Sequence, residues 1–360
     1  MRIGRVSKLR ESCSTAFLPR SVVAALSLLY PAEKGRAVTA DQTIDYDSIY
    51  GIMAPHAVGE QARIEKDLTR FVHYTTAQSA LEILQSKCLW MRNATCMNDY
   101  NEMAHGLHCV IEAFRTDAGK EFNAALDASH AGLAKELDDK FTAAAPELIA
   151  HTYISSVSEH SDDEEAYGRL SMWQSYGSKA GAAIVLNPGP FLRPTDALPI
   201  WVSPVAYIGP QGVQAEIQKI AEKMDSQRAL LATVPREELL EIAFRMLIIS
   251  VVSSKHEGFR EEREWRIVHM PTLWPADPER LPLNQVSLSG VPQPIFRIPF
   301  VDYPDEGFYG ATIPDLIHRI IVGPTQYPAA SRMAFAQVLG AAGVELSLDR
   351  VHCSDVTLRT

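Results

Sequence analysis

Four short groups of polar and aromatic residues have the types and spacing that binding and catalytic sites use. Each lies where a strand is expected to begin or end, and sites tend to form at such positions. The groups are His73, Tyr74 and Thr75; Asn98, Asp99 and Glu102; Trp173 and Tyr176; and Glu262, Glu264 and Arg266. Together they offer imidazole and carboxylates for acid–base or charge-stabilising chemistry, with aromatic rings for stacking.

The fourth group alternates along one expected strand, so its three side chains should share one face. Two acids and a base on a core face must be paired. Each group could also have a purely structural role. These roles are a turn hydrogen bond at His73, a turn and helix cap at Asn98 and Asp99, core packing of Trp173 and Tyr176, and a structural ion pair between Glu264 and Arg266. Their joint occurrence favours a site.

The usual short motifs of several enzyme classes are absent from the sequence. It has no G-x-G-x-x-G, no G-x-x-x-x-G-K-[ST], no H-E-x-x-H, no C-x-x-C and no G-x-S-x-G. These absences disfavour a Rossmann dehydrogenase, a P-loop NTPase, a zincin and an α/β-hydrolase.

Two further clusters could bind metal, but we predict no metal site. Cys96, His105, His108 and Cys109 do not have the spacing of a standard zinc module, although His105 and Cys109 lie four residues apart on one expected helix. The acidic run 162–165 is expected to be a solvated loop rather than a site for a hard cation.

Composition favours a globular protein in a reducing compartment. Of 360 residues, 46% are apolar and 22% charged, and the net charge is −10. An acidic chain is not suited to broad nucleic-acid binding. Five cysteines without tight spacing argue against a disulfide scaffold, and no apolar run is long enough for a transmembrane helix. We therefore expect a cytoplasmic protein that binds neither membranes nor nucleic acid broadly.

Hydrophobic spacing predicts an α+β fold with a single mixed sheet and helical insertions. Residues 1–65 are expected to be a peripheral extension, 66–326 the main domain, and 327–360 a helix and strand packed on it. Thr75 and Gln78 should form a capping box that starts a helix after the strand 71–74. The proline-rich stretch 271–294 should be an irregular loop, and strands are expected at 152–158, 180–186, 200–208, 264–270, 295–300, 318–323 and 344–351.

Five segments occur in an order that resembles a bacterial family known as domain of unknown function 2971. They are "HYTTAQSALEIL", "MNDYNE", "SMWQSYG", "EREWRIV" and "IIVGP", within about residues 68–326. The strand before the third segment reads "YISSVS", a departure from the family's usual cysteine, phenylalanine and serine.

The stretch "HYTTAQSALEILQSKCLWM" also resembles the opening of ADP-ribosyltransferases. That resemblance implies an ADP-ribosyltransferase-like core, NAD as substrate, His73 as a ribose-binding residue and Glu264 as the catalytic glutamate. It further implies that Tyr74, Thr75, Trp173 and Tyr176 contact NAD. Asn98, Asp99, Glu102, Glu262 and Arg266 would support the site. The glycine usual after the helix is replaced here by Lys87 and Cys88.

Three functions therefore remain open. The favoured one is an NAD-consuming transferase or glycohydrolase, a toxin or phage-defence effector that acts on an unidentified acceptor and is held by a partner or antitoxin protein. The second is a metal-dependent nuclease or hydrolase built on Asp99, Glu102, Glu262 and Glu264. The third is a non-catalytic sensor or interaction module, in which the polar groups only stabilise the fold.

Overall fold

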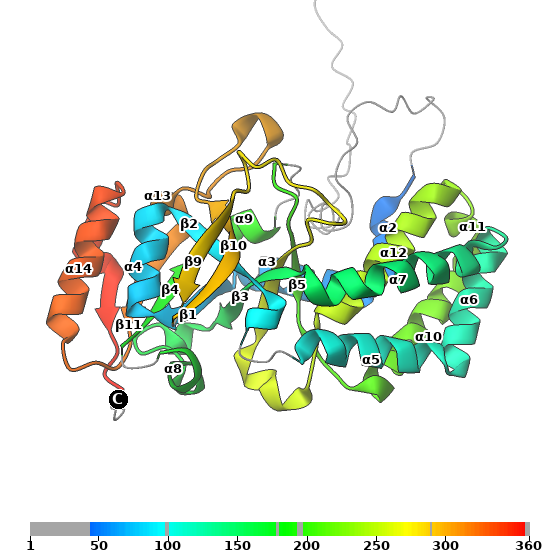
Figure 1. Ribbon diagram of the computed structural model, residues 1–360, viewed down its shortest axis with the longest axis horizontal. Coiled ribbons are helices and arrows are strands. Elements are labelled where there is room, and N and C mark those ends of the chain that lie inside the picture. The colour runs from blue at the N-terminus through cyan, green and yellow to red at the C-terminus, as the bar shows by residue number, and fades with distance from the viewer. Residues whose placement is uncertain (1–43, 98–100, 178–179, 193–196, 289, 357–360) are drawn as a thin grey trace, which may run out of the picture.

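The chain builds a mixed β-sheet and a bundle of helices that lie side by side (Figure 1). The computed structural model describes residues 44–97, 101–177, 180–192, 197–288 and 290–356. The large sheet contains β1 Arg70–Thr76, β2 Cys88–Asn93, β3 Tyr153–His160, β4 Gly181–Leu186, β5 Trp201–Pro204, β8 Glu264–His269, β9 Leu283–Leu288, β10 Val291–Pro299, β11 Ile317–Val322 and β12 Val351–Cys353. A separate two-stranded sheet joins β6 Ala206–Tyr207 to β7 Ser254–Lys255.

Most helices belong to insertions between the strands. The described helices are α2 Tyr46–Met53, α3 Pro55–Asp67, α4 Ala77–Ser86, α5 Glu102–Phe114, α6 Asp117–Ser129, α7 Leu133–Ala150, α8 Leu170–Tyr176, α9 Gly189–Leu192, α10 Pro210–Ser226, α11 Arg228–Leu231, α12 Arg236–Val252, α13 Ile313–Leu316 and α14 Pro328–Ala341. Helices α5–α7 are inserted between β2 and β3, and α10–α12 between β6 and β7; with α2 they form the bundle (Figure 1). The expected α+β class with a mixed sheet and helical insertions is confirmed.

The order of the large sheet is β12-β11-β4-β1-β3-β2-β10-β9, and β8 and β5 extend it from β3. Strand β8 pairs with β3 over residues 153–158. The other edge of β3 is shared, because β1 pairs near its end at 158–160 and β2 near its start at 153–154. The sheet therefore forks at residues 155–157 of β3, between β1 and β2.

Helices cover both faces of the sheet beside this fork. On one face, Val72 and Tyr74 of β1 pack with Trp173 of α8. On the other face, Phe71 of β1 belongs to the same apolar cluster as Ile83 of α4 and the buried residues of α14. The side chains of β1 alternate between the two faces and so contribute to two separate apolar clusters. The groups at the fork itself are polar.

Several expected boundaries are wrong. Residues 344–351 are not a strand, because a 3-10 turn occupies Ser347–Arg350 and β12 begins only at Val351. The stretch 271–294 is not a structureless loop, since it contains β9 and the start of β10. Pro292 and Pro294 are tolerated there because β10 pairs with β9 alone before it reaches β2 at Ile295.

The segment before the sheet is not peripheral from residue 44 onward. Ile49, Tyr50 and Met53 of α2 are at most 1% exposed in the core of the bundle, and Ile64 of α3 is fully buried beneath the sheet. The sequence pattern hid this role because α2 is only eight residues long. Residues 1–43 lie outside the described part of the chain.

Candidate functional site

The fork in the sheet is bridged by His73. Its Nδ1 lies 2.8 Å from the carbonyl oxygen of Ser156, in the stretch of β3 that has no strand partner on this edge. The imidazole thus replaces the backbone donor that a continuous sheet would supply. The strand-to-helix break after it is capped by Thr76, which accepts from the Ser79 amide, so the expected cap at Thr75 with Gln78 is wrong.

The bond to Ser156 fixes the protonation of His73. A carbonyl can only accept, so Nδ1 carries the proton and Nε2 is an acceptor. Burial lowers the pKa of His73, which keeps the ring neutral near pH 7. The side chain remains half-buried, and Nε2 has no partner within the described residues. A hydroxyl group could therefore donate to Nε2.

A network of five charged side chains lies next to Ser156, on α5, β7, β8 and the 3-10 helix Glu257–Glu262. We call it the Lys255 network, and its members are Glu102, Lys255, Glu262, Glu264 and Arg266. The Nζ of Lys255 lies 2.8 Å from Glu102 Oε1, 2.6 Å from Glu262 Oε2 and 2.9 Å from Glu264 Oε2. Three acids thus share two bases.

Glu264 is the most completely paired acid of the network. Oε1 accepts from Ser156 Oγ at 2.6 Å and from Arg266 Nε at 3.0 Å, and Oε2 accepts from Lys255. Although burial opposes ionisation, Arg266 and Lys255 lower the pKa of Glu264 to about 2. With 4% of its side chain exposed, Glu264 has no free face for a substrate.

Glu262 is the outermost acid of the network. Its side chain is 14% exposed, against 9% for Glu102 and 4% for Glu264. Oε2 is held by Lys255, whereas Oε1 accepts, among the described residues, only from the Tyr176 hydroxyl, at 3.2 Å. Burial raises the pKa of Glu262 against the opposing charge of Lys255. A carboxyl with a raised pKa and one lightly held oxygen suits proton transfer.

The centre of the three carboxylates is filled by the Lys255 ammonium, where a divalent cation would have to sit. Its four-carbon stem is buried, and the ammonium also lies 4.9 Å from the centre of the Phe259 ring. Glu264 and Glu102 raise the pKa of Lys255 against the effect of burial, so the lysine stays charged. A metal at this position would need to displace a buried, triply paired cation.

Tyr74 and Trp173 form a packed pair rather than an exposed stacking surface. Their ring centres are 4.9 Å apart, and they are 5% and 2% exposed. The Tyr74 hydroxyl accepts from the Arg169 amide, and burial raises its pKa to about 12. Glycines enclose the indole: a Cβ on Gly181 or Gly323 would come within 3.0 Å of it. The predicted contact of these two rings with NAD therefore has no accessible surface.

The acidic run 162–165 also differs from expectation. Glu164 is buried and paired with Arg169, whose Nε lies 2.8 Å from Oε1, while Glu165 accepts from His160 and His318. Asp162 and Asp163 alone are exposed, as the solvated-loop prediction requires. Glu165 thus ties the loop to β3 and β11, and Glu164 holds it to Arg169.

The structure brings together most of the predicted site residues. Glu102, Glu262, Glu264, Arg266 and Tyr176 are linked directly, and His73 joins them through Ser156. Thr75 pairs with Ala182 in the sheet, and no described hydrogen bond joins its side chain to the network. Asn98 and Asp99 lie outside the described residues.

Sequence reasoning missed Lys255, Ser156 and Tyr207. Tyr207 accepts from the Glu264 amide at 2.7 Å. Lys255 follows the apolar helix α12 after two serines, and a charge directly after a buried helix was the available signal. Ser156 and Tyr207 lie in ordinary strand patterns and offered none.

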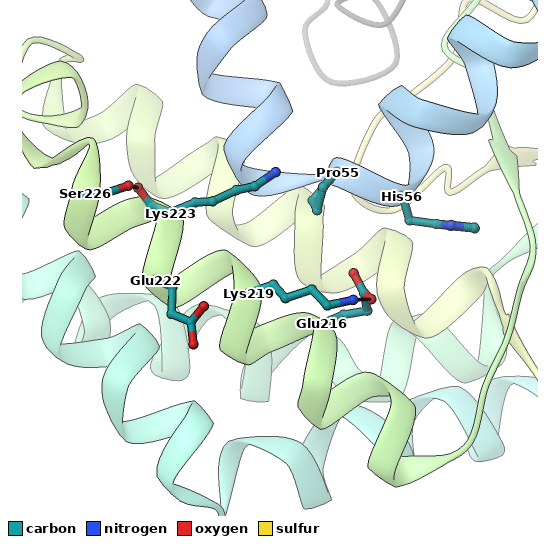
Figure 2. A pocket seen from close by; sticks show the side chains of 7 residues that line it. All are labelled: Pro55, His56, Glu216, Lys219, Glu222, Lys223 and Ser226. Carbon is teal, nitrogen blue, oxygen red and sulfur yellow. Dashed lines mark hydrogen bonds and ion pairs between the residues drawn. The ribbon is translucent and has the colours of Figure 1, made fainter.

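Two hollows lined by described residues lie away from the Lys255 network. One of about 500 Å³ lies between the α2–α3 turn and α10 (Figure 2). Its charged side chains are engaged: Lys219 pairs with Glu216 at 2.7 Å, and Lys223 donates to the Gly51 carbonyl. A smaller apolar cavity of about 70 Å³ is lined by Leu89, Phe191 and Ile267, among others. Neither contains a predicted site residue.

Comparison with known proteins bears on the middle of the chain. Residues 172–267 match the model of a family described as "Protein of unknown function (DUF2971)". The match covers two of the five segments, from Met172 in α8 to Ile267 in β8, and so spans Tyr176, Lys255, Glu262, Glu264 and Arg266. It supports the resemblance to DUF2971 in this region. No curated protein and no solved structure matches the chain.

Across the described residues, no helix combines the length and the apolar character needed to cross a membrane.

Proposed function

We propose that this protein cleaves the bond between nicotinamide and ribose in NAD, as a glycohydrolase or an ADP-ribosyltransferase. One observation carries the proposal: Ser156 links a histidine and a carboxylate, because its carbonyl accepts from the neutral His73 and its hydroxyl donates to Glu264, which shares Lys255 with Glu262. Such a pair can hold a sugar hydroxyl and stabilise an oxocarbenium-like centre.

In this proposal His73 binds the ribose. Its Nε2 accepts from a ribose hydroxyl, while Ser156 fixes the ring through Nδ1. Tyr176, which keeps partial exposure and donates to Glu262, lies beside the nicotinamide.

Glu262 acts on the reacting centre. The C–N bond between ribose and nicotinamide breaks, and its electron pair leaves with the nicotinamide. The carboxylate of Glu262 faces the positive charge that develops on the ribose. An oxygen of water or of an acceptor then forms the new bond and loses its proton to Glu262. Glu264, which has both oxygens occupied, is a positioning residue that holds Lys255 and Arg266.

The metal-dependent alternative draws less support from this geometry. Glu102, Glu262 and Glu264 do converge, but they converge on Lys255. The non-catalytic alternative rests on the same pairing, since a closed ion network also stabilises a fold.

Nicotinamide release from NAD by the purified protein tests the proposal. Glu262→Gln and His73→Ala should each lower the rate about 100-fold or more, the usual range for a lost acid–base group. The matched controls are Glu261→Gln and His108→Ala, because both residues are exposed and lie outside the network. No release by a stoichiometric amount of wild-type protein, or equal rates in Glu262→Gln, would overturn it.

The pH dependence gives a second test of His73. Because its pKa lies below the ordinary value of 6.5, the ring should lose its acceptor nitrogen only below that pH. NAD binding should therefore be constant above pH 6.5 and weaken on acidification, and His73→Gln should remove that dependence. Titrations followed by tryptophan fluorescence would measure it.

A further inference from the structure

Two arginines lie on one face of the sheet beyond the fork. Arg92 of β2 is paired with Ile295 of β10, and Arg297 lies two residues further along β10, opposite Trp90. Residues that are diagonal neighbours in this way are roughly 7–8 Å apart and share a face. We call Arg92 and Arg297 the arginine pair.

No carboxylate within the described residues is paired with either arginine. Arg92 donates to Gln293 Oε1 at 2.9 Å and to the Cys96 carbonyl, both of which are neutral. The Nε of Arg297 is buried and has no hydrogen-bond partner. Burial lowers the pKa of Arg92, so its surroundings disfavour the charge that it carries. A half-buried cation normally has a counter-charge.

Two further polar atoms on the same face are also buried and unpaired. They are the Nε1 of Trp90, opposite Arg297, and the Oδ1 of Asn284, opposite Ile295. Trp90 as a whole is 8% exposed. Unsatisfied buried polar groups are rare in native proteins, and several on one face indicate a missing partner.

The strand pairing places this face beside the proposed NAD site. Arg92 lies opposite Ile154 of β3, and Ser156, whose hydroxyl donates to Glu264, follows two residues later on the same face. Two residues along a strand span about 7 Å. Arg92 therefore lies beside the fork, on the face of the sheet that carries the Lys255 network.

We propose that the arginine pair binds the diphosphate of a nucleoside diphosphate. Arginine suits phosphate because its guanidinium presents several donors in one plane. The inference rests on the proposed function, since the diphosphate of NAD would lie on the face of the sheet that carries the Lys255 network. It supplies the anion-binding part of the site, which the Lys255 network lacks.

Calorimetric titration with ADP tests the arginine pair without any catalysis. Arg92→Gln and Arg297→Gln should each weaken ADP binding at least tenfold, whereas Arg297→Lys should retain part of it. Arg115→Gln is the matched control, because that side chain is 71% exposed and paired with Glu112. Inorganic pyrophosphate should compete with ADP, and adenosine should not. Melting curves of each variant show that it is folded.

The outcomes separate the two proposals. ADP binding that both glutamine variants retain, or the absence of ADP binding to the wild type at millimolar concentration, overturns the arginine site. Competition by adenosine alone also overturns it. ADP binding that is lost in the variants, without nicotinamide release by the wild type, supports the arginine site and rejects NAD cleavage.

Discussion

The Lys255 network and the arginine pair lie on the same side of the sheet, but their charged groups differ in whether they have partners of opposite charge. In the network, Arg266 is fully buried and each of its neighbouring acids is also held by Lys255. In the arginine pair, neither guanidinium has a carboxylate partner among the described residues, and the Nε of Arg297 has no hydrogen-bond partner among them. The first region is complete within the protein, whereas the second lacks an anion.

This difference suggests how structural and ligand-binding charges can be told apart. A buried charge whose partners come from the same chain contributes to the fold, and its removal leaves the partners unpaired. A half-buried charge without such partners is tolerated at some cost in stability, so its removal should harm binding rather than folding. Glu262 lies between these cases, because one oxygen is held by Lys255 and the other is only lightly held.

The largest effect should follow from Arg266→Met. The substitution leaves Glu102 and Glu264 with Lys255 as their one remaining cation, in a fully buried setting. The loss of one partner from a buried pair costs about 3–5 kcal/mol of unfolding free energy. Urea unfolding at pH 7 measures it, with the exposed Arg115→Met as control. An unchanged unfolding midpoint would show that the network does not support the fold.

The next effect should come from Glu264→Gln. The contacts predict a clear loss of stability, because Lys255 and Arg266 each lose a directly paired, buried carboxylate. Hydrogen bonds to charged groups contribute about 1.5–3 kcal/mol each. Thermal melting would measure the loss, and a melting temperature equal to that of the wild type would contradict this account.

Acidification should separate Glu264→Gln from the wild type. The pKa of Glu264 is lowered from 4.5 to about 2, so its contribution to stability is full above pH 4.5 and is lost as the pH falls towards 2. Unfolding free energies measured from pH 7 to pH 3 should therefore fall less steeply in Glu264→Gln than in the wild type. If the two curves of unfolding free energy against pH are parallel, groups other than Glu264 cause the loss of stability in acid.

The smallest effects on stability should come from Glu262→Gln and Arg92→Gln. Each should change the unfolding free energy by less than about 1 kcal/mol, because Glu262 already has a raised pKa and Arg92 has no counter-charge to leave unpaired. Both should nevertheless impair ligand binding or turnover. A loss of several kcal/mol of unfolding free energy in either variant would show that the residue supports the fold.

Much of the sheet could be predicted because local patterns determine it. The run "FVHYTT" before a capped helix and the alternation of Glu264 and Arg266 both follow from short-range geometry. The Lys255 network could be predicted only in part, because it joins positions 102, 255 and 264 through tertiary packing. The burial of Trp173 depends on glycines at 181 and 323, which no helical spacing reveals. The arginine pair depends on the register between β2 and β10, about 200 residues apart.

That register also has a consequence for how the chain folds. Strand β2 is synthesised early, but its partner β10 follows about 200 residues later in the sequence. Strand β3 likewise precedes its partner β8 by more than 100 residues. Pairings this distant slow folding, since a long loop must close before any contact rewards it. Until then the apolar β2 has a free edge towards β10, and free strand edges promote aggregation. Chains truncated before about residue 290 should therefore be aggregation-prone, and should depend on chaperones far more than the full-length protein.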